Sequence, residues 1–194
     1  MDVPDDPIVR FTRLFERAAR DAPFDYTAAT LATSTPQGVP SVRVVLVRHV
    51  DARGFAFFTN YDSQKGRELA ANPVAELCFY WPWIDEQVRA RGEVRRLGDD
   101  ESDEYFATRP RGSQVGAWAS RQSEPLASRR ELEDRWREVE RQFDGRGIPR
   151  PPNWGGYRLA PDRIEFWKAG EFRLHDRALY TRTGGTWSVV ALYP

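Results

Sequence analysis

The chain has 194 residues, of which 40% are hydrophobic and 30% are charged, and its 29 basic and 29 acidic residues cancel. This composition is typical of a soluble globular protein, which we expect to form one domain over residues 1–194. The charge balance argues against nucleic-acid and membrane partners. The lack of a long apolar run or a signal peptide predicts a cytoplasmic location.

Cysteine and histidine are scarce in the chain. Cys78 is the only cysteine, so no disulfide can form within the chain, and we interpret it as an inert core thiol. Only two histidines accompany it. These are too few ligands for a protein-bound zinc ion, and we predict no metal site.

The N-terminal third of the chain predicts one helix followed by short strands. Asp6 offers a helix cap before Pro7, and apolar residues then recur at helical spacing to about Asp21. A second helix is predicted at 63–71, with Ser63 as its cap. Strands are predicted at 27–35, 39–50, 55–59, 74–80 and 87–97. Short strands joined by tight turns indicate antiparallel pairing in a sandwich or a barrel.

The second half of the chain mixes helices and strands. Residues 99–108 predict a helix, a stretch containing glycine and serine follows at 109–123, and Ser128 with Glu131 fits a capping box that opens another helix. A loop is expected at 144–155. Further strands are predicted at 157–159, 163–168, 172–182 and 186–192. The elements together predict an α+β fold that is mainly β.

One stretch near the C-terminus suggests a pocket. Residues two apart on a strand share a face, so Arg173, His175 and Arg177 would project together, while Phe172 and Leu174 would face the core. Two guanidinium groups around an imidazole suit an anionic, planar ligand. A solvated strand face is the alternative interpretation.

Further groups suited to binding anions occur along the chain. Arg43 and Arg48 end an apolar strand and, five residues apart, should face opposite sides and serve different partners. The other clusters are Ser63-Gln64-Lys65 at a helix start, Tyr105 with residues 109–113, and Gln122-Ser123. Each alone could be a solvated surface. Together they exceed what one phosphate needs and suggest two phosphorylated ligands.

The order of these pieces resembles the pyridoxamine 5′-phosphate oxidase family, FMN-dependent enzymes that complete pyridoxal 5′-phosphate. The resemblance runs from Asp6 to Pro194. Its most specific parts are RPRGSQVGAW at 109–118, QS at 122–123, WGG at 154–156, IEFW at 164–167 and RLHDR at 173–177. It implies an FMN-binding split barrel, an antiparallel Greek-key barrel with flanking helices. It also implies a homodimer with FMN at the interface.

The resemblance implies a role for particular residues. FMN would be held by Arg43, Val44, Val45, Leu46, Phe58, Thr59, Lys65, Gln87, Gln122, Ser123, Trp167 and Arg177. In the family these ligands come from two subunits. The phosphate of a pyridine substrate would be bound by Arg48, Tyr105, Arg109 and Ser113. Arg173 and His175 would lie over the pyridine ring as the catalytic pair.

The implied reaction is the oxidation of pyridoxamine or pyridoxine 5′-phosphate to pyridoxal 5′-phosphate, with O2 as acceptor and H2O2 as product. The chain departs from the family pattern in three respects: Arg48 replaces the usual lysine, Gln64 replaces a frequent arginine, and the N-terminal arm is short.

Two alternative functions remain open at this point. Residues 63–69 and the Tyr80-Trp81 pair resemble the phenazine-pathway branch, whose members oxidise larger aromatic secondary metabolites. The second alternative is a flavin- or haem-binding module without turnover. The intact set of Tyr105, Arg109 and Ser113 favours oxidation of vitamin B6 phosphates.

Overall fold

The computed structural model describes residues 6–194, and the expected absence of a signal peptide in residues 1–5 lies outside this range. The helices are α1 (Pro7–Arg20), α2 (Gln64–Ala71), α3 (Asp99–Thr108), α4 (Arg111–Ala119) and α5 (Arg129–Gln142), with short 3-10 turns η1 (Pro82–Ile84) and η2 (Glu171–Arg173). The strands are β1 (Ala28–Ser34), β2 (Pro40–Asp51), β3 (Gly54–Asn60), β4 (Val74–Trp81), β5 (Glu86–Arg96), β6 (Trp154–Lys168), β7 (Asp176–Thr183) and β8 (Thr186–Ala191). No helix within the described range is long and apolar enough to span a membrane.

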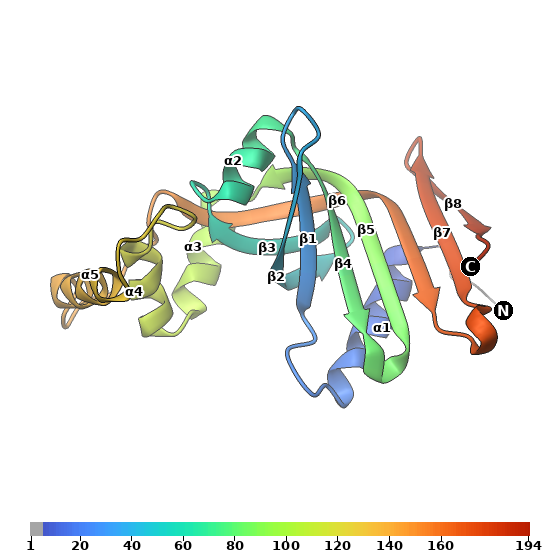
Figure 1. Ribbon diagram of the computed structural model, residues 1–194, viewed down its shortest axis with the longest axis horizontal. Helices are drawn as coiled ribbons and strands as arrows, with labels where there is room; N and C mark the ends of the chain where they lie inside the picture. The colour runs from blue at the N-terminus through green and yellow to red at the C-terminus, as the bar shows by residue number, and fades with distance from the viewer. Residues whose placement is uncertain (1–5) are drawn as a thin grey trace.

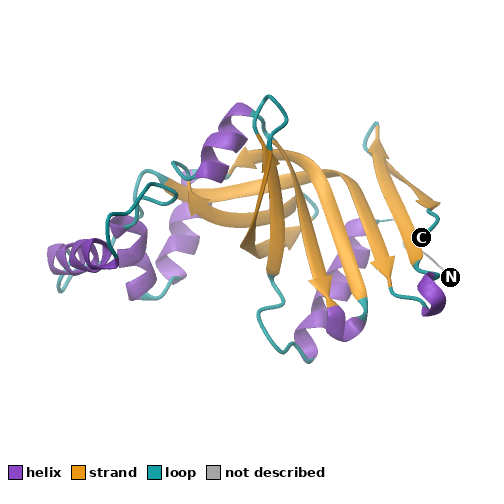
Figure 2. Cartoon of the chain, viewed as in Figure 1, coloured by secondary structure: helices purple, strands orange, loops and turns teal. Residues whose placement is uncertain are grey.

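Six of the strands in residues 6–194 close into a barrel (Figures 1 and 2). They follow the order β3-β2-β1-β4-β5-β6, and β3 pairs with β6 to complete the ring. Every pairing is antiparallel. Beyond β6 the sheet continues through β7 and β8, outside the barrel. The predicted antiparallel barrel with flanking helices is confirmed.

The long strand β6 belongs to both the barrel and its extension. Residues 154–159 pair with residues 55–60 of β3, and residues 163–168 pair with residues 176–181 of β7. Strand β5 pairs with β6 along most of its length. A single strand therefore ties the closing seam of the barrel to the outer sheet.

A bulge explains why β6 is one strand where the sequence predicts two. The register between β5 and β6 shifts between Arg91 and Gly92, and Gly92 lies opposite Pro161. A Cβ on Gly92 would lie 1.9 Å from the carbonyl oxygen of Ala160, so only glycine fits there. Pro161 interrupts the alternating pattern of the sequence, but the bulge accommodates it without ending the strand.

Helix α1 and the barrel share an aromatic core. The side chain of Asp6 accepts a hydrogen bond from the backbone N–H of Ile8 at 2.7 Å, which confirms the predicted cap. Phe11 is fully buried, and its ring centroid lies 4.8 Å from that of Phe55 and 4.9 Å from that of Phe79. Cys78 on β4 is half-buried on the face opposite the core residues Leu77 and Phe79, so the predicted core position is wrong. Burial raises the pKa of its thiol, which is consistent with an unreactive thiol.

Three helices form a second apolar cluster beside the barrel. Residues of α3, α4 and α5 pack with Trp154 of β6 and Phe58 of β3. Helix α4 occupies the stretch in which the sequence predicts no helix. Glycines and serine weaken helix propensity there, but packing against α5 compensates.

The predicted strand at residues 172–175 is wrong. These residues form a tight turn in which Phe172 and Arg173 have positive φ angles of 55° and 65°, and β7 begins at Asp176. Arg173, His175 and Arg177 therefore do not alternate along one strand. Phe172 and Leu174, which the sequence places in the core, are 89% and 71% exposed in the single chain.

We expect Phe11→Ala to lower the free energy of unfolding by about 3–5 kcal/mol, because it leaves a cavity among packed aromatic rings. Urea denaturation followed by circular dichroism measures this change. Val9→Ala is the matched control on the exposed face of the same helix and should change stability by less than about 0.5 kcal/mol. Equal effects of the two substitutions would contradict the role of Phe11 in the aromatic core that α1 shares with the barrel.

Candidate functional site

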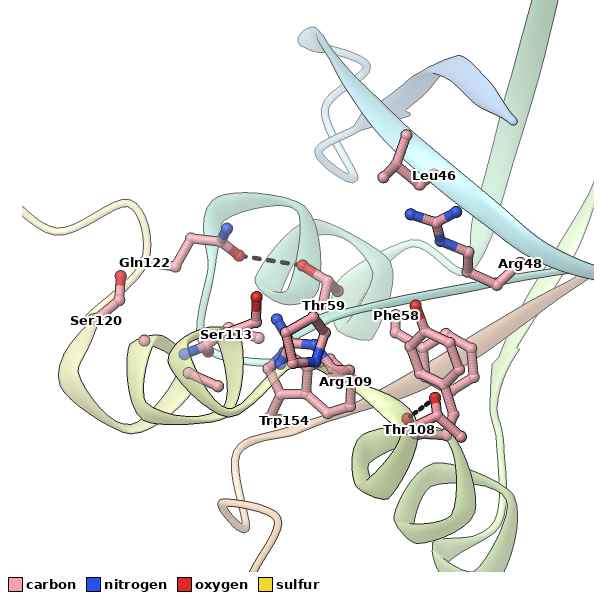
Figure 3. Close-up of a pocket in the computed structure, with 15 residues that line it drawn as sticks. Leu46, Arg48, Phe58, Thr59, Thr108, Arg109, Ser113, Ser120, Gln122 and Trp154 are labelled. Atoms are coloured by element: carbon pink, nitrogen blue, oxygen red, sulfur yellow. Dashed lines mark hydrogen bonds between the residues drawn. The ribbon is translucent and has the colours of Figure 1, made fainter. Parts of the chain in front are cut away.

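A cavity of about 670 Å³ opens between strands β2 and β3 and helices α3 and α4 (Figure 3). Eight of the residues that the sequence assigns to ligand binding line it: Leu46, Arg48, Phe58, Thr59, Tyr105, Arg109, Ser113 and Gln122. Residues assigned to the substrate and to the cofactor thus line one cavity. The cavity is the candidate site.

Arg109 is a partly buried cation of this cavity. It is the last residue before Pro110, which caps α4, and its guanidinium carbon lies 4.6 Å from the centre of the Trp154 ring. Its Nη1 is buried and has no hydrogen-bond partner. Burial lowers the pKa of Arg109, yet a guanidinium remains charged in proteins. A buried donor without an acceptor is rare, and a bound anion would satisfy it.

Other polar groups face the same space. Arg48 projects from β2 and is loosely held, with its guanidinium 3.3 Å from Oγ1 of Thr27 and 3.6 Å from the carboxylate of Asp25. Tyr105 lies on α3 and Ser113 on the first turn of α4. Two guanidinium groups and two hydroxyls therefore line one cavity, a combination that suits a phosphate.

A second buried cation lies behind the cavity wall. Lys65 on α2 is 7% exposed, and its Nζ donates to Oγ1 of Thr59 at 3.1 Å, to Oε1 of Gln122 at 3.1 Å and to Oγ of Ser63 at 3.2 Å. All three acceptors are neutral. Burial, with the nearby charge of Arg43, lowers the pKa of Lys65 to about 8. An anion beside Lys65 would favour its charged form.

Arg43 is held away from the cavity. It donates to Oγ of Ser41 at 2.7 Å and to the carboxylate of Glu68 at 3.2 Å. Burial acts to raise the pKa of Glu68. The hydrogen bonds that its carboxylate accepts, chiefly from Ser41 and also from Gln64, lower this pKa to about 2. Arg48 lies on the opposite face of β2, so the two arginines have different contacts, as the sequence predicts.

Three other residues assigned to FMN do not line the cavity with their side chains. Val45 points into the barrel core, and Val44 is exposed on the outer face of the same strand. Ser123 has a positive φ angle of 73° and borders a smaller hollow near α5. Their assignment to the cofactor stays a prediction.

The remaining assigned residues gather at the other end of the molecule. Gln87, Trp167 and Arg177 are paired in register across β5, β6 and β7, and the His175 ring lies 4.7 Å from that of Trp167. Arg173 belongs to the turn just before β7. In Figure 1, β7 and the end of β6 lie at the opposite end of the long axis from α4. Within one chain, the two sets do not form one site.

Neighbouring contacts orient this second set. Arg177 donates to Oε1 of Glu165 from Nε at 2.9 Å and from Nη2 at 2.7 Å. The backbone N–H of Gly170 donates to Nδ1 of His175 at 3.2 Å. The imidazole is therefore held through one nitrogen, and Nε2 is left for a ligand.

The sequence reasoning missed seven residues that line the cavity: Asn60, Thr108, Pro110, Gly116, Ala117, Ser120 and Trp154. Four lining residues of the 113–120 segment, Ser113, Gly116, Ala117 and Ser120, recur at helical spacing. That spacing was the available signal for α4 and its inward face. Trp154 lies in the quoted WGG segment, but no role was assigned to it.

Two protein-family models match the chain. Residues 15–143 match the model described as pyridoxamine 5′-phosphate oxidase. Residues 154–194 match the model described as the pyridoxine 5′-phosphate oxidase C-terminal dimerisation region. The chain belongs to the pyridoxamine 5′-phosphate oxidase family. The resemblance noted in the sequence is thus confirmed, and the dimerisation-region match supports a homodimer.

Relatives in the pyridoxamine 5′-phosphate oxidase family match over nearly the whole chain. A pyridoxine/pyridoxamine 5′-phosphate oxidase from Anaeromyxobacter dehalogenans is 60% identical over 189 residues, which cover 97% of this chain and 96% of the relative. One from Rubrobacter xylanophilus is 57% identical over 189 residues, covering 97% and 87%. The named relatives are oxidases.

Solved structures share the fold. PhzG from Burkholderia lata, in complex with tetrahydrophenazine-1-carboxylic acid, matches with a TM-score of 0.94 and 35% identity over 100% of this chain and 95% of that one. A pyridoxamine 5′-phosphate oxidase-related, FMN-binding protein from Nostoc punctiforme matches with a TM-score of 0.76 and 20% identity, covering 100% of each chain. The second likeness concerns the fold alone.

Lys65 should make the stability of the ligand-free protein depend on pH. Its pKa is about 8 in the fold against an ordinary value of 10.5, so between these pH values the unfolded chain binds more protons than the folded one. The free energy of unfolding of the wild type, relative to Lys65→Met, should therefore rise with pH across this window by up to about 3 kcal/mol.

Urea denaturation at about pH 7 and about pH 10 measures this difference. Lys168→Met, at an exposed position on β6, is the matched control for loss of a lysine. If the free energy of unfolding changed with pH equally in the wild type and in Lys65→Met, the fold would not disfavour the charged amine of Lys65.

Proposed function

We propose that this protein is an FMN-dependent oxidase that converts pyridoxine or pyridoxamine 5′-phosphate to pyridoxal 5′-phosphate and reduces O2 to H2O2. The observation that carries the proposal is Nη1 of Arg109, a buried donor beside the cavity that has no hydrogen-bond partner. Arg48, Tyr105 and Ser113 line the same cavity. A phosphate supplies the acceptor oxygens and the negative charge that these groups need.

The residues around Lys65 fit the phosphate of FMN. Lys65 is a buried cation bonded only to neutral oxygens, and it lies in the first turn of α2, where the helix dipole favours an anion. Phe58, Thr59 and Gln122 would hold the flavin from the same subunit. Bound FMN would supply hydride acceptance from the substrate and electron transfer to O2.

The second set of residues would come from the other subunit of a homodimer. Gln87, Trp167 and Arg177 would complete the flavin site, and Arg173 and His175 would lie over the pyridine ring. Two observations support this arrangement. The two sets lie apart in one chain, with α4 and β7 toward opposite ends of the long axis (Figure 1), and residues 154–194 match a dimerisation region.

The chain's own contribution to the reaction is positioning. Arg48, Arg109, Tyr105 and Ser113 would fix the substrate phosphate and thereby the reacting carbon. Pyridoxine 5′-phosphate loses two electrons and two protons at its alcohol carbon to give the aldehyde. Pyridoxamine 5′-phosphate gives an imine, which water hydrolyses to the aldehyde and ammonia.

A second candidate is oxidation of a larger, unphosphorylated aromatic compound. The likeness to PhzG, with its TM-score of 0.94, favours this reading. A carboxylate on such a substrate could accept from the buried donor of Arg109, but a single carboxylate has fewer acceptor oxygens than a phosphate for Arg48, Arg109, Tyr105 and Ser113. The identity to named vitamin B6 phosphate oxidases, at 60%, also exceeds the 35% identity to PhzG.

Turnover of the flavin-loaded protein in air tests the proposal. Pyridoxine 5′-phosphate should give the aldehyde and an equal amount of peroxide, and pyridoxine without its phosphate is the control substrate. Failure on both vitamin B6 phosphates would overturn the proposal. Oxidation of a tricyclic aromatic carboxylic acid in its place would support the second candidate.

Variants of Arg48 sharpen this experiment. Arg48→Lys keeps a cation and should hold kcat/KM on pyridoxine 5′-phosphate within about tenfold, whereas Arg48→Ala removes a charge-assisted phosphate contact and should lower it further, by about 10- to 100-fold. Arg53→Ala, at an exposed arginine on the following turn, is the matched control. Equal kcat/KM for wild type and Arg48→Ala would contradict the phosphate role.

Mixed dimers test whether each site draws on both subunits. Arg109→Ala and Arg173→Ala alter different sets, so each homodimer should be impaired. In a heterodimer isolated with two affinity tags, one site would carry both wild-type sets, and turnover should return to about half of the wild-type value per dimer. If both sets belonged to one subunit, every site in the mixed dimer would keep one lesion and no activity would return.

A further inference from the structure

The WGG segment at residues 154–156 has no role in the function proposed above. Trp154 is the first residue of β6, and its side chain is 6% exposed at the base of the cavity, beneath Arg109 (Figure 3). It lies where the barrel meets the apolar cluster of the helices. Its surroundings assign it a role in the phosphate site.

The indole of Trp154 supports the guanidinium of Arg109. Within residues 6–194, Arg109 forms no ion pair shorter than 4.0 Å. Its guanidinium carbon lies 4.6 Å from the ring centre of Trp154 and 5.6 Å from that of Phe106. Stacking on an aromatic face uses the face of the guanidinium and leaves the N–H groups on its edge free to donate. Trp154 can thus hold the cation without consuming the donors that a phosphate would use.

The same indole sets the tilt of the rings beside it. Phe58 lies nearly parallel to Trp154, with centroids 5.8 Å apart and planes 14° apart. Tyr105 stacks on Phe58 at 3.8 Å and 20°, and its plane is 7° from that of Trp154. Two of the four residues assigned to the phosphate thus depend on one indole: Arg109 lies over its ring, and the Tyr105 ring is parallel to it.

The two glycines that follow let β6 lie close to neighbouring side chains. A Cβ on Gly155 would lie 2.1 Å from Oη of Tyr61, and a Cβ on Gly156 would lie 2.9 Å from Cε1 of Phe58. Only glycine lets β6 lie this close to the rings. The Nη1 of Arg150 also donates to the carbonyl of Trp154 at 2.7 Å, which fixes the backbone at the start of the strand.

We propose that Trp154 is a positioning residue of the phosphate site, which holds the Arg109 guanidinium and the Tyr105 ring ready before a phosphate binds. The proposal deepens the proposed function and rests on its assignment of Arg109 to the substrate phosphate. A guanidinium on a flexible stem loses rotamer freedom when it binds an anion. Trp154 restricts that freedom in the free protein, so phosphate binds more tightly.

A double-mutant cycle on the flavin-loaded protein tests this role. The variants are Trp154→Leu, which removes the aromatic face, Arg109→Gln, which removes the charge, and the two together. The dissociation constant of inorganic phosphate is measured by calorimetry, and KM and kcat are measured on pyridoxine 5′-phosphate. Trp118→Leu is the matched control, because Trp118 packs in the same apolar cluster but does not contact Arg109.

We expect Trp154→Leu to weaken phosphate binding and raise KM by about three- to thirtyfold, the range of a desolvated cation–π contact, and to leave kcat within about threefold. In the Arg109→Gln background, the same substitution should change phosphate binding by less than about twofold. Trp118→Leu should lower the melting temperature but not weaken phosphate binding. A merely structural role would give equal fold losses in both backgrounds and would overturn the proposal.

Trp154→Phe keeps the test valid if Trp154→Leu does not fold. The weaker aromatic face of phenylalanine should give an intermediate loss of phosphate affinity, again only when Arg109 is present. Absence of any phosphate binding by the wild type would overturn the positioning role. Phosphate binding with the expected coupling, but no oxidation of either vitamin B6 phosphate, would support the positioning role and refute the proposed substrate.

Discussion

Two buried cations without a carboxylate partner are the constraint on which the candidate site depends. Nζ of Lys65 donates to neutral oxygens, with the carboxylate of Glu68 nearby but beyond ion-pair distance, and Arg109 lies over an indole, so neither cation forms an ion pair among the described residues. Burying an unpaired charge is unfavourable, and the lowered pKa of each group reflects this. Lys65 and the Nη1 atom of Arg109 are already buried in the free protein. Anions that bind there meet positive charges that the fold has already placed.

The scaffold holds these charges by joining two different kinds of packing. The barrel fixes one wall of the cavity through the paired strands β2 and β3, and the helices α3 and α4 supply the other. Arg109 lies in the short connection where α3 ends and Pro110 caps α4. Its backbone is therefore restrained from both sides, while Trp154 links the helical cluster to the barrel.

Much of the barrel could be predicted because its strands alternate and its turns contain glycine and proline. The caps at Asp6 and Ser63 could also be read from residue type. The failures have physical causes. The turn at Phe172 and Arg173 depends on positive φ angles that these residues rarely adopt, and α4 depends on packing against α5 rather than on propensity.

The site was predictable in its parts but not in its arrangement. Residue types and their order identified the groups that could bind anions, and family resemblance assigned them to two ligands. The contact of Trp154 with Arg109 joins residues 45 positions apart in the sequence, and no local pattern encodes it. Strand β6 adds a further consequence, because it carries Trp154 at one end and Trp167 at the other, about 40 Å away along an extended chain. An inserted or deleted residue between them would turn one tryptophan to the opposite face of the sheet. Strand β6 should therefore tolerate substitutions far better than insertions or deletions.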